Sequence, residues 1–199
     1  MDEEKPVEEQ VLFSKETIVA ESRLKSYSRD DLDVLFIALN PPEQSNSNKH
    51  YFSGKQSRFF KLLAVSGLIT QEIPKACADE RVFGTKEINY RGASFGVADL
   101  VSDIVETRSG KVRVVAADVL TLVSRIRSLA PRFACVIHSK VLNSLNRHGG
   151  LVRELKYGWC GLVLRDCATE FVVNYFPNGN SITDGEKVRI FCLLRDRLE

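Results

Sequence analysis

Asn40 directly follows the apolar run 33–39 and precedes Pro41 and Pro42. Its amide oxygen can accept a hydrogen bond from a water molecule, and its NH₂ group can donate to a carbonyl or a ligand. A neutral amide cannot act as a carboxylate base, so Asn40 could position a water but could not deprotonate it. The alternative is that Asn40 is only a turn residue before Pro41.

Two aromatic residues and one acid could complete a ligand site with Asn40. Phe52 lies in a polar loop, where its ring could stack on a planar ligand, and Tyr51 takes that role if the register differs by one residue. The alternative for Phe52 is ordinary core packing. Asp99 could accept a hydrogen bond from a ligand N–H, but we favour a surface or helix-start position for it.

A second group of polar residues has the chemistry of phosphate contacts. In the late loop, Gly179 allows close approach of the backbone to a phosphate, and Ser181 can bond a phosphate oxygen. The neighbouring Asn178 and Asn180 carry further amides, although a plain turn would explain the same loop. Ser139 and Lys140 start a predicted helix, whose N-terminus could contact another phosphate.

Strand-like and helix-like segments alternate along the chain and would position these residues. Short apolar runs predict strands at 33–39, 133–137, 159–164 and 171–176. Apolar residues at helical spacing predict helices at 57–66, 117–129, from Ser139 as N-cap to Gly149, at 184–198 and, more briefly, at 17–27. This alternation predicts an α/β fold with a mainly parallel central sheet, a single-domain three-layer α/β/α sandwich over residues 13–199. Residues 1–12 are expected to form a flexible acidic tail.

Three of the predicted strands end in polar or conformationally special residues, at Asn40, His138 and Pro177. Ligands of open parallel sheets bind beyond the carboxyl ends of the strands. We therefore expect these three loops to meet at one functional edge.

Three segments in register resemble the uracil-DNA glycosylase superfamily, closest to its mismatch-specific uracil/thymine and hypoxanthine branches. The first contains Ala38-Leu-Asn-Pro-Pro42, Tyr51-Phe-Ser-Gly54 and Ser57-Arg-Phe-Phe60, where those branches carry Gly-x-Asn-Pro-Gly, a stacking aromatic and Asn-Arg-Phe-Trp. The second runs from Tyr90 to Val101, and the third is the loop 176–181, which resembles the family's DNA-inserting loop. The resemblance covers residues 33–199. It departs from the family pattern at Ala38 and Pro42, which replace glycines, and in the late loop.

The resemblance implies a monofunctional DNA glycosylase of base-excision repair. Such an enzyme hydrolyses the N-glycosidic bond of a flipped deaminated base, uracil first, with hypoxanthine or mismatched thymine as further substrates. Asn40 would then place the attacking water, Phe52 would stack on the base, Asp99 would help to select it, and the late loop would contact DNA. An amide in place of a carboxylate predicts a slow enzyme.

Composition bounds the remaining choices. The chain has 199 residues, of which 44% are hydrophobic and 27% charged, and its net charge is +2. Residues 1–33 hold ten acids and five bases, whereas the rest hold 16 acids and 23 bases, a distribution compatible with a polyanionic partner. The five cysteines form no close CxxC pair, so we expect reduced thiols and neither a metal nor another cofactor. We expect a cytoplasmic, nucleoid-associated monomer with DNA as partner and no membrane contact.

Other functions remain open at this point. The loss of glycine at position 42 could leave a noncatalytic nucleic-acid-binding member of the same fold. A nucleotide-binding α/β module is weaker, because no Walker or GxGxxG sequence follows a predicted strand. A Ser/His/Asp hydrolase using Ser139, His138 and Asp99 is weaker still, because Ser139 does not lie in a GxSxG sequence and adjacent residues at a strand end point in different directions.

Overall fold

The computed structural model describes residues 22–179 and 181–199, and within them five strands form one mixed sheet. The spatial order is β2-β1-β3-β5-β4; all neighbouring pairs are parallel except β4 with β5. The strands are β1 (Val34–Ala38), β2 (Phe95–Asp99), β3 (Phe133–Val136), β4 (Gly158–Leu162) and β5 (Glu170–Val173). The main helices are α1 (Glu43–Asn48), α2 (Phe59–Val65), α3 (Ala116–Leu129), α4 (Ser139–His148) and α5 (Asp184–Arg195).

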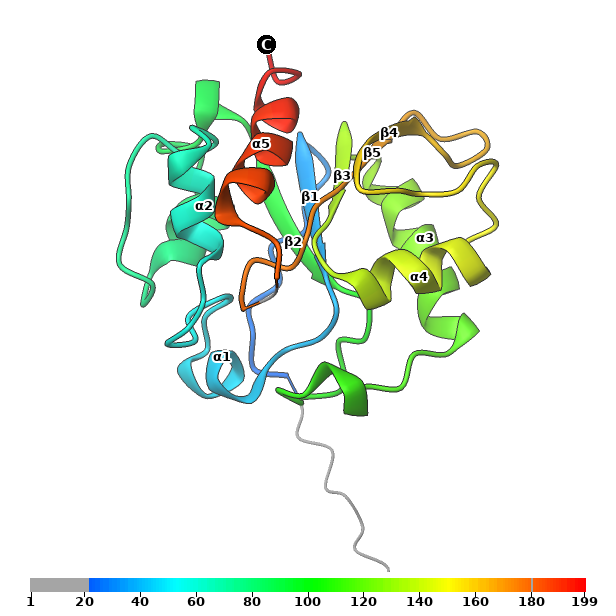
Figure 1. Ribbon diagram of the computed structural model, residues 1–199, viewed down its shortest axis with the longest axis horizontal. Coiled ribbons are helices and arrows are strands. Elements are labelled where there is room, and N and C mark those ends of the chain that lie inside the picture. Colours follow the sequence, from blue (N-terminus) through cyan, green and yellow to red (C-terminus); the bar gives the residue numbers. More distant parts are fainter. Residues whose placement is uncertain (1–21, 180) are drawn as a thin grey trace, which may run out of the picture.

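Helices cover both faces of the sheet, with α2 and α5 on one side and α3 and α4 on the other (Figure 1). Successive side chains of a strand point to opposite faces, so β1 contributes to both cores. Phe36 packs in the core that contains α2 and α5, whereas Leu35 and Ile37 pack in the core that contains α3 and α4. The predicted three-layer α/β/α sandwich with a mainly parallel sheet is confirmed.

Most predicted elements match the observed ones within a few residues, but the short helix α1 was not predicted, and neither was the strand β2. Its segment contains Gly96, which weakens a strand pattern. In the fold, a Cβ at Gly96 would lie 2.6 Å from the backbone oxygen of Tyr27, so only glycine lets the 22–33 segment cross this strand. The same strand places Asp99 in the interior, so our preference for a surface or helix-start Asp99 was wrong.

Two local predictions also need correction. Residues 22–27 form no helix, and the other residues of the predicted 17–27 helix lie outside the described part of the chain, as does the predicted tail 1–12. The N-cap of α4 is His138 rather than Ser139: His138 is extended, and its Nδ1 accepts a hydrogen bond from the Lys140 backbone N–H at 3.0 Å. Ser139 is the first residue of the helix and is exposed.

Candidate functional site

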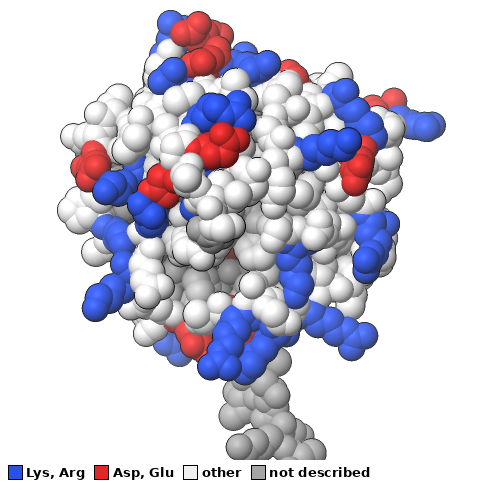
Figure 2. Space-filling view, viewed as in Figure 1, with Lys and Arg blue, Asp and Glu red and all other residues white. Residues whose placement is uncertain are grey.

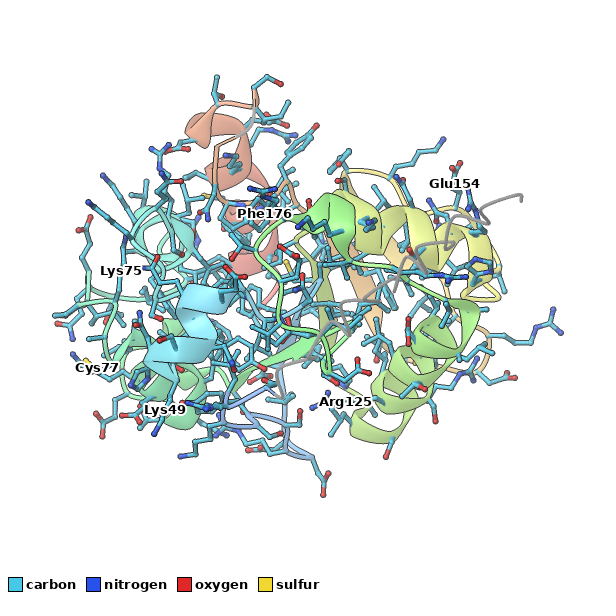
Figure 3. The ribbon with its side chains drawn as sticks, turned by 90° about the horizontal axis from the view of Figure 1, so that it is seen from below. Lys49, Lys75, Cys77, Arg125, Glu154 and Phe176 are labelled. Carbon is cyan, nitrogen blue, oxygen red and sulfur yellow. The ribbon has the colours of Figure 1, made fainter. Side chains whose placement is uncertain are left out.

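A cavity of about 490 Å³ lies where the loops after β1, β2, β3 and β5 meet. This volume is within the range of small-molecule sites. Its lining combines the loop after β1 with later segments and includes Asn40, Pro42, Ser45, Tyr51, Phe52, Asp99, Glu106, His138, Phe176 and Asn178. The expected meeting of three strand-end loops at one edge is therefore confirmed. Seen from below the sheet, Phe176 lies near the middle of the molecule between α1 and α4 (Figure 3).

The Asn40 side chain is fixed by backbone carbonyls. Its Nδ2 donates to the carbonyl oxygens of Pro41 (3.1 Å), Ile104 (3.1 Å) and Glu106 (2.8 Å). Carbonyl oxygens can accept hydrogen bonds only from the NH₂ end of the amide, so the atom near these three carbonyls is Nδ2 and the opposite atom of the amide is Oδ1. No donor within the described residues bonds to Oδ1, and Asn40 lines the cavity. This amide oxygen is held ready to accept a hydrogen bond from a water or ligand.

Phe52 forms part of the cavity wall and is supported from the core. Its ring stacks on Phe59, with the centroids 4.0 Å apart and the planes at 23°, and it meets Phe60 edge to face. Its backbone has φ +54°, which is unfavourable for a bulky residue. Phe52 is half-buried: it packs against the core and also lines the cavity. The two alternatives considered from the sequence therefore both hold.

Asp79, a residue that the sequence reasoning overlooked, holds the loop that carries Phe52. Its buried carboxylate accepts hydrogen bonds from the Tyr51 backbone N–H (2.9 Å) and the Glu80 N–H (2.9 Å). It also contacts His50 Nδ1 at 2.9 Å. This carboxylate holds two consecutive residues of the loop, His50 and Tyr51, without lining the cavity.

Asp99 and Tyr51 form a polar corner of the cavity. Asp99 is 7% exposed, and its Oδ2 has no hydrogen-bond partner among the described residues. Burial raises the pKa of Asp99 to about 7, although the Tyr51 hydroxyl and Arg125 act to lower it. Near neutral pH the carboxyl therefore exists in both forms and can either donate to a carbonyl or accept from an N–H. The Ser45 hydroxyl, also buried and without a described partner, adds a second polar atom to the lining.

His138 is the second residue whose role in the site was underestimated from sequence. Because its Nδ1 accepts the Lys140 N–H, the proton of the neutral ring must be on Nε2. Burial and the Lys140 charge lower the pKa of His138 to about 4, so the ring is neutral at pH 7. The ring lines the cavity and meets Phe176 edge to face, with centroids 5.2 Å apart. A neutral Nε2–H donor at a cavity wall suits an oxygen that gains negative charge.

Of the predicted DNA-contacting residues that the structure describes, Asn178 lines the cavity, whereas Ser139, Lys140, Gly179 and Ser181 do not. Asn178 lines the cavity and accepts the Arg58 backbone N–H through Oδ1 at 3.0 Å, which joins the late loop to the start of α2. Gly179 has φ +31° with open space around its Cα, and Ser181 is exposed, whereas Asn180 lies outside the described residues. Lys140 reaches across to the carbonyl oxygens of Ser109 and Val112, at 2.7 Å each.

Glu106 was not singled out in the sequence, because nothing in its neighbours marks it. Glu106 lines the same cavity, its Oε1 accepts the Arg108 backbone N–H at 2.7 Å, and its Oε2 lies 3.9 Å from Lys111 Nζ. Its backbone carbonyl is one of the acceptors of Asn40. The cavity lining therefore includes a second acidic residue beside the fixed amide.

Basic grooves adjoin the cavity at both ends, and Figure 2 shows Lys and Arg side chains on either side of a hollow in this face. The first groove shares Lys55, Gln56 and Ser57 with the cavity lining and adds the basic residues Arg58, Lys61 and Lys75. The second begins at Gly110, next to Ser109 of the cavity, and contains Lys111, Arg113, Lys140 and Arg147 with no acidic residue in its lining. Such flanks favour a polyanionic ligand.

Some possible features are not found in the described part of the chain. No group of three or more His, Cys, Asp or Glu side chains within 22–179 and 181–199 could hold a metal ion. No helix in these ranges has the length and apolar character needed to cross a membrane. The chain matches no model of a known protein family and no curated protein.

Proposed function

We propose that the protein is a monofunctional DNA glycosylase that hydrolyses the N-glycosidic bond of a flipped deaminated base. The observation that carries the proposal is the Asn40 amide, whose NH₂ is bound to three carbonyls while Oδ1 is left at the cavity. An oxygen held in this way can place a water without rearrangement during the reaction, which is how preorganised polar groups lower a barrier. The resemblance of the 38–60, 90–101 and 176–181 segments to glycosylases supports the same role.

The cavity walls suit a planar base. A base cannot be reached inside a stacked duplex, so it must be turned out into a pocket. The Phe52 ring offers a stacking surface, and base–aromatic stacking contributes about 1–3 kcal/mol. The Asp99 carboxyl, in its ionised form, can accept a hydrogen bond from the ring N–H that uracil, thymine and hypoxanthine share. Cytosine and adenine present a lone pair at the corresponding ring nitrogen, which a carboxylate repels, so this contact favours deaminated bases.

The leaving base and the sugar acquire opposite charges when the bond breaks. His138 Nε2–H is the donor in the cavity for a base oxygen that becomes negative, and it remains neutral at pH 7. Glu106 supplies a carboxylate that can stabilise a cationic sugar and accept a proton from the water. No cofactor takes part in this scheme.

A noncatalytic DNA-binding protein is the second candidate, suggested by Pro42 in place of glycine. Pro42 is the N-cap of α1 and lies in the cavity lining together with Asn40. The volume of about 490 Å³ beside it leaves room for a base, which favours the enzyme.

The test is base release from labelled oligonucleotides. Single- and double-stranded substrates with uracil, hypoxanthine or a G·T mismatch are incubated with the protein, and alkali then cleaves at abasic sites. We expect cleavage at one or more of these bases and none at cytosine or adenine. Binding without release from any substrate would establish the noncatalytic candidate instead.

A further inference from the structure

Three aromatic residues lie where β4 begins and β5 ends, at the edge of the sheet that carries the cavity. Tyr157 directly precedes β4, and Tyr175 and Phe176 follow β5, its antiparallel neighbour. The rings of Tyr157 and Tyr175 are stacked, with centroids 3.9 Å apart and planes at 13°. Phe176, the next residue after Tyr175, lines the cavity and meets His138.

Two of these three aromatic residues are unusually exposed. Among the exposed large hydrophobic residues of the described chain, the two aromatic ones are Tyr157 at 41% and Phe176 at 39%. Neither tyrosine hydroxyl has a hydrogen bond to another described residue, so neither ring is held in place through its polar end. Exposed rings beside a cavity offer flat apolar surface to a ligand.

The backbone at Tyr175 is fixed by contacts to the core. The Tyr175 backbone N–H donates to Oδ1 of the buried Asn174 at 2.8 Å, and Asn174 Nδ2 donates to the Lys187 carbonyl on α5 at 2.9 Å. A surface that is already ordered loses little conformational entropy when a ligand binds. The stack therefore has the properties of a prepared platform.

We propose that the Tyr157–Tyr175 pair is a stacking platform for an unpaired nucleobase next to the nucleotide that occupies the cavity. The proposal rests on the proposed function, because the cavity must hold one nucleotide of a polynucleotide. Bases bind proteins in this way through their π-faces, with little dependence on sequence. The exposed Lys156 beside Tyr157 supplies positive charge for a connecting phosphate, whereas Arg189 is paired with Glu186 on α5.

A platform at this place has a consequence for the substrate. A base of an intact duplex is already stacked on its neighbours, so its faces are not free to stack on a protein ring. The ligand favoured by the platform is therefore single-stranded DNA, or a strand that is locally opened around the flipped nucleotide.

The experiment uses the full chain and undamaged single-stranded oligonucleotides that carry 2-aminopurine at successive positions. Stacking of this fluorescent base on an aromatic ring quenches its emission. We expect quenching of 2-aminopurine in the wild type, its loss in Tyr157→Ala, and affinity lower by about fivefold or more in that variant. Tyr157→Phe, which keeps the ring, is the matched control and should behave as the wild type.

Several results would overturn the proposal. One is unchanged quenching and affinity in Tyr157→Ala, and another is an equal loss in Tyr157→Phe, which would assign the effect to the hydroxyl. A wild-type dimer in sedimentation that Tyr157→Ala dissociates would show that a second copy covers the platform. Because these readouts need no base release, excision assays on the same variants separate a failed platform from a failed glycosylase.

Discussion

Replacement of Asn40 by alanine tests the proposed reaction most directly, and the structure gives two expected effects. The first is on stability, since the carbonyls of Pro41, Ile104 and Glu106 lose their shared donor. Two N–H groups serve these acceptors, and each hydrogen bond contributes about 0.5–1.5 kcal/mol, so the free energy of unfolding should fall by roughly 1–3 kcal/mol. For a domain of this size that corresponds to a Tm lower by about 2–12 °C.

The second effect is on the chemical step. Loss of one preorganised polar contact typically lowers a rate by about 10²-fold or more, near 3 kcal/mol. Single-turnover excision should therefore fall by this factor in Asn40→Ala at a temperature well below its Tm. Affinity for the damaged oligonucleotide, measured by fluorescence anisotropy, should change far less, because Phe52 and Asp99 remain.

Asn40→Asp is the matched variant for this test. From side-chain chemistry alone a carboxylate could act as a base, so this variant could equal the wild type. In the fold, however, the carboxylate has no N–H for the three carbonyl oxygens and places negative charge against them. We expect Asn40→Asp to be less stable and slower than the wild type. Excision at the wild-type rate by both folded variants would refute the role of Asn40.

Three further predictions concern the rest of the site. Phe52→Leu should weaken capture of a flipped base by about 1–3 kcal/mol in a binding titration, and it should lower Tm less than Phe52→Ala does. If both variants lower Tm equally and neither changes binding, Phe52 is a core residue only. Because the pKa of Asp99 is raised to about 7, the contribution of this group to stability is complete below pH 4 and is lost as pH rises to 7. The Tm difference between the wild type and Asp99→Asn should therefore change with pH across this window. A Tm difference that stays constant would contradict the prediction. Lys111→Gln with Arg113→Gln should reduce the salt dependence of DNA affinity by about one unit of logarithmic slope per lost phosphate contact, whereas Arg127→Gln on α3 should leave it unchanged.

The sequence predicted elements well where one local pattern determined them. The apolar run before Asn40 gave β1, and the stripe from Val119 to Ile126 gave α3, because periodicity reports burial directly. β2 was missed because the need for Gly96 comes from a segment far away in the sequence. The N-cap of α4 was misassigned because propensity favours Ser139, whereas the ring of His138 makes the bond in the fold.

The candidate site shows the same division. Asn40, Phe52 and Asn178 could be proposed from their loops, since strand ends of an α/β sheet are the expected place for ligands. Glu106 and Asp79 could not, because only tertiary contacts bring them to Asn40 and to the 50–52 loop. The shared position of Asp99 and His138 in one cavity also depends on the strand order, which the sequence did not give.

The dependence of the Phe52 loop on Asp79 limits how this protein can change during evolution. A substitution at Asp79 would remove the acceptor of the Tyr51 and Glu80 N–H groups and the partner of His50 at once. Its effect on the free energy of unfolding and that of a substitution at His50 should therefore not be additive. Replacement of one of these residues would need a compensating replacement of another. We therefore expect positions 50 and 79 to covary among natural relatives, even though neither side chain lines the cavity.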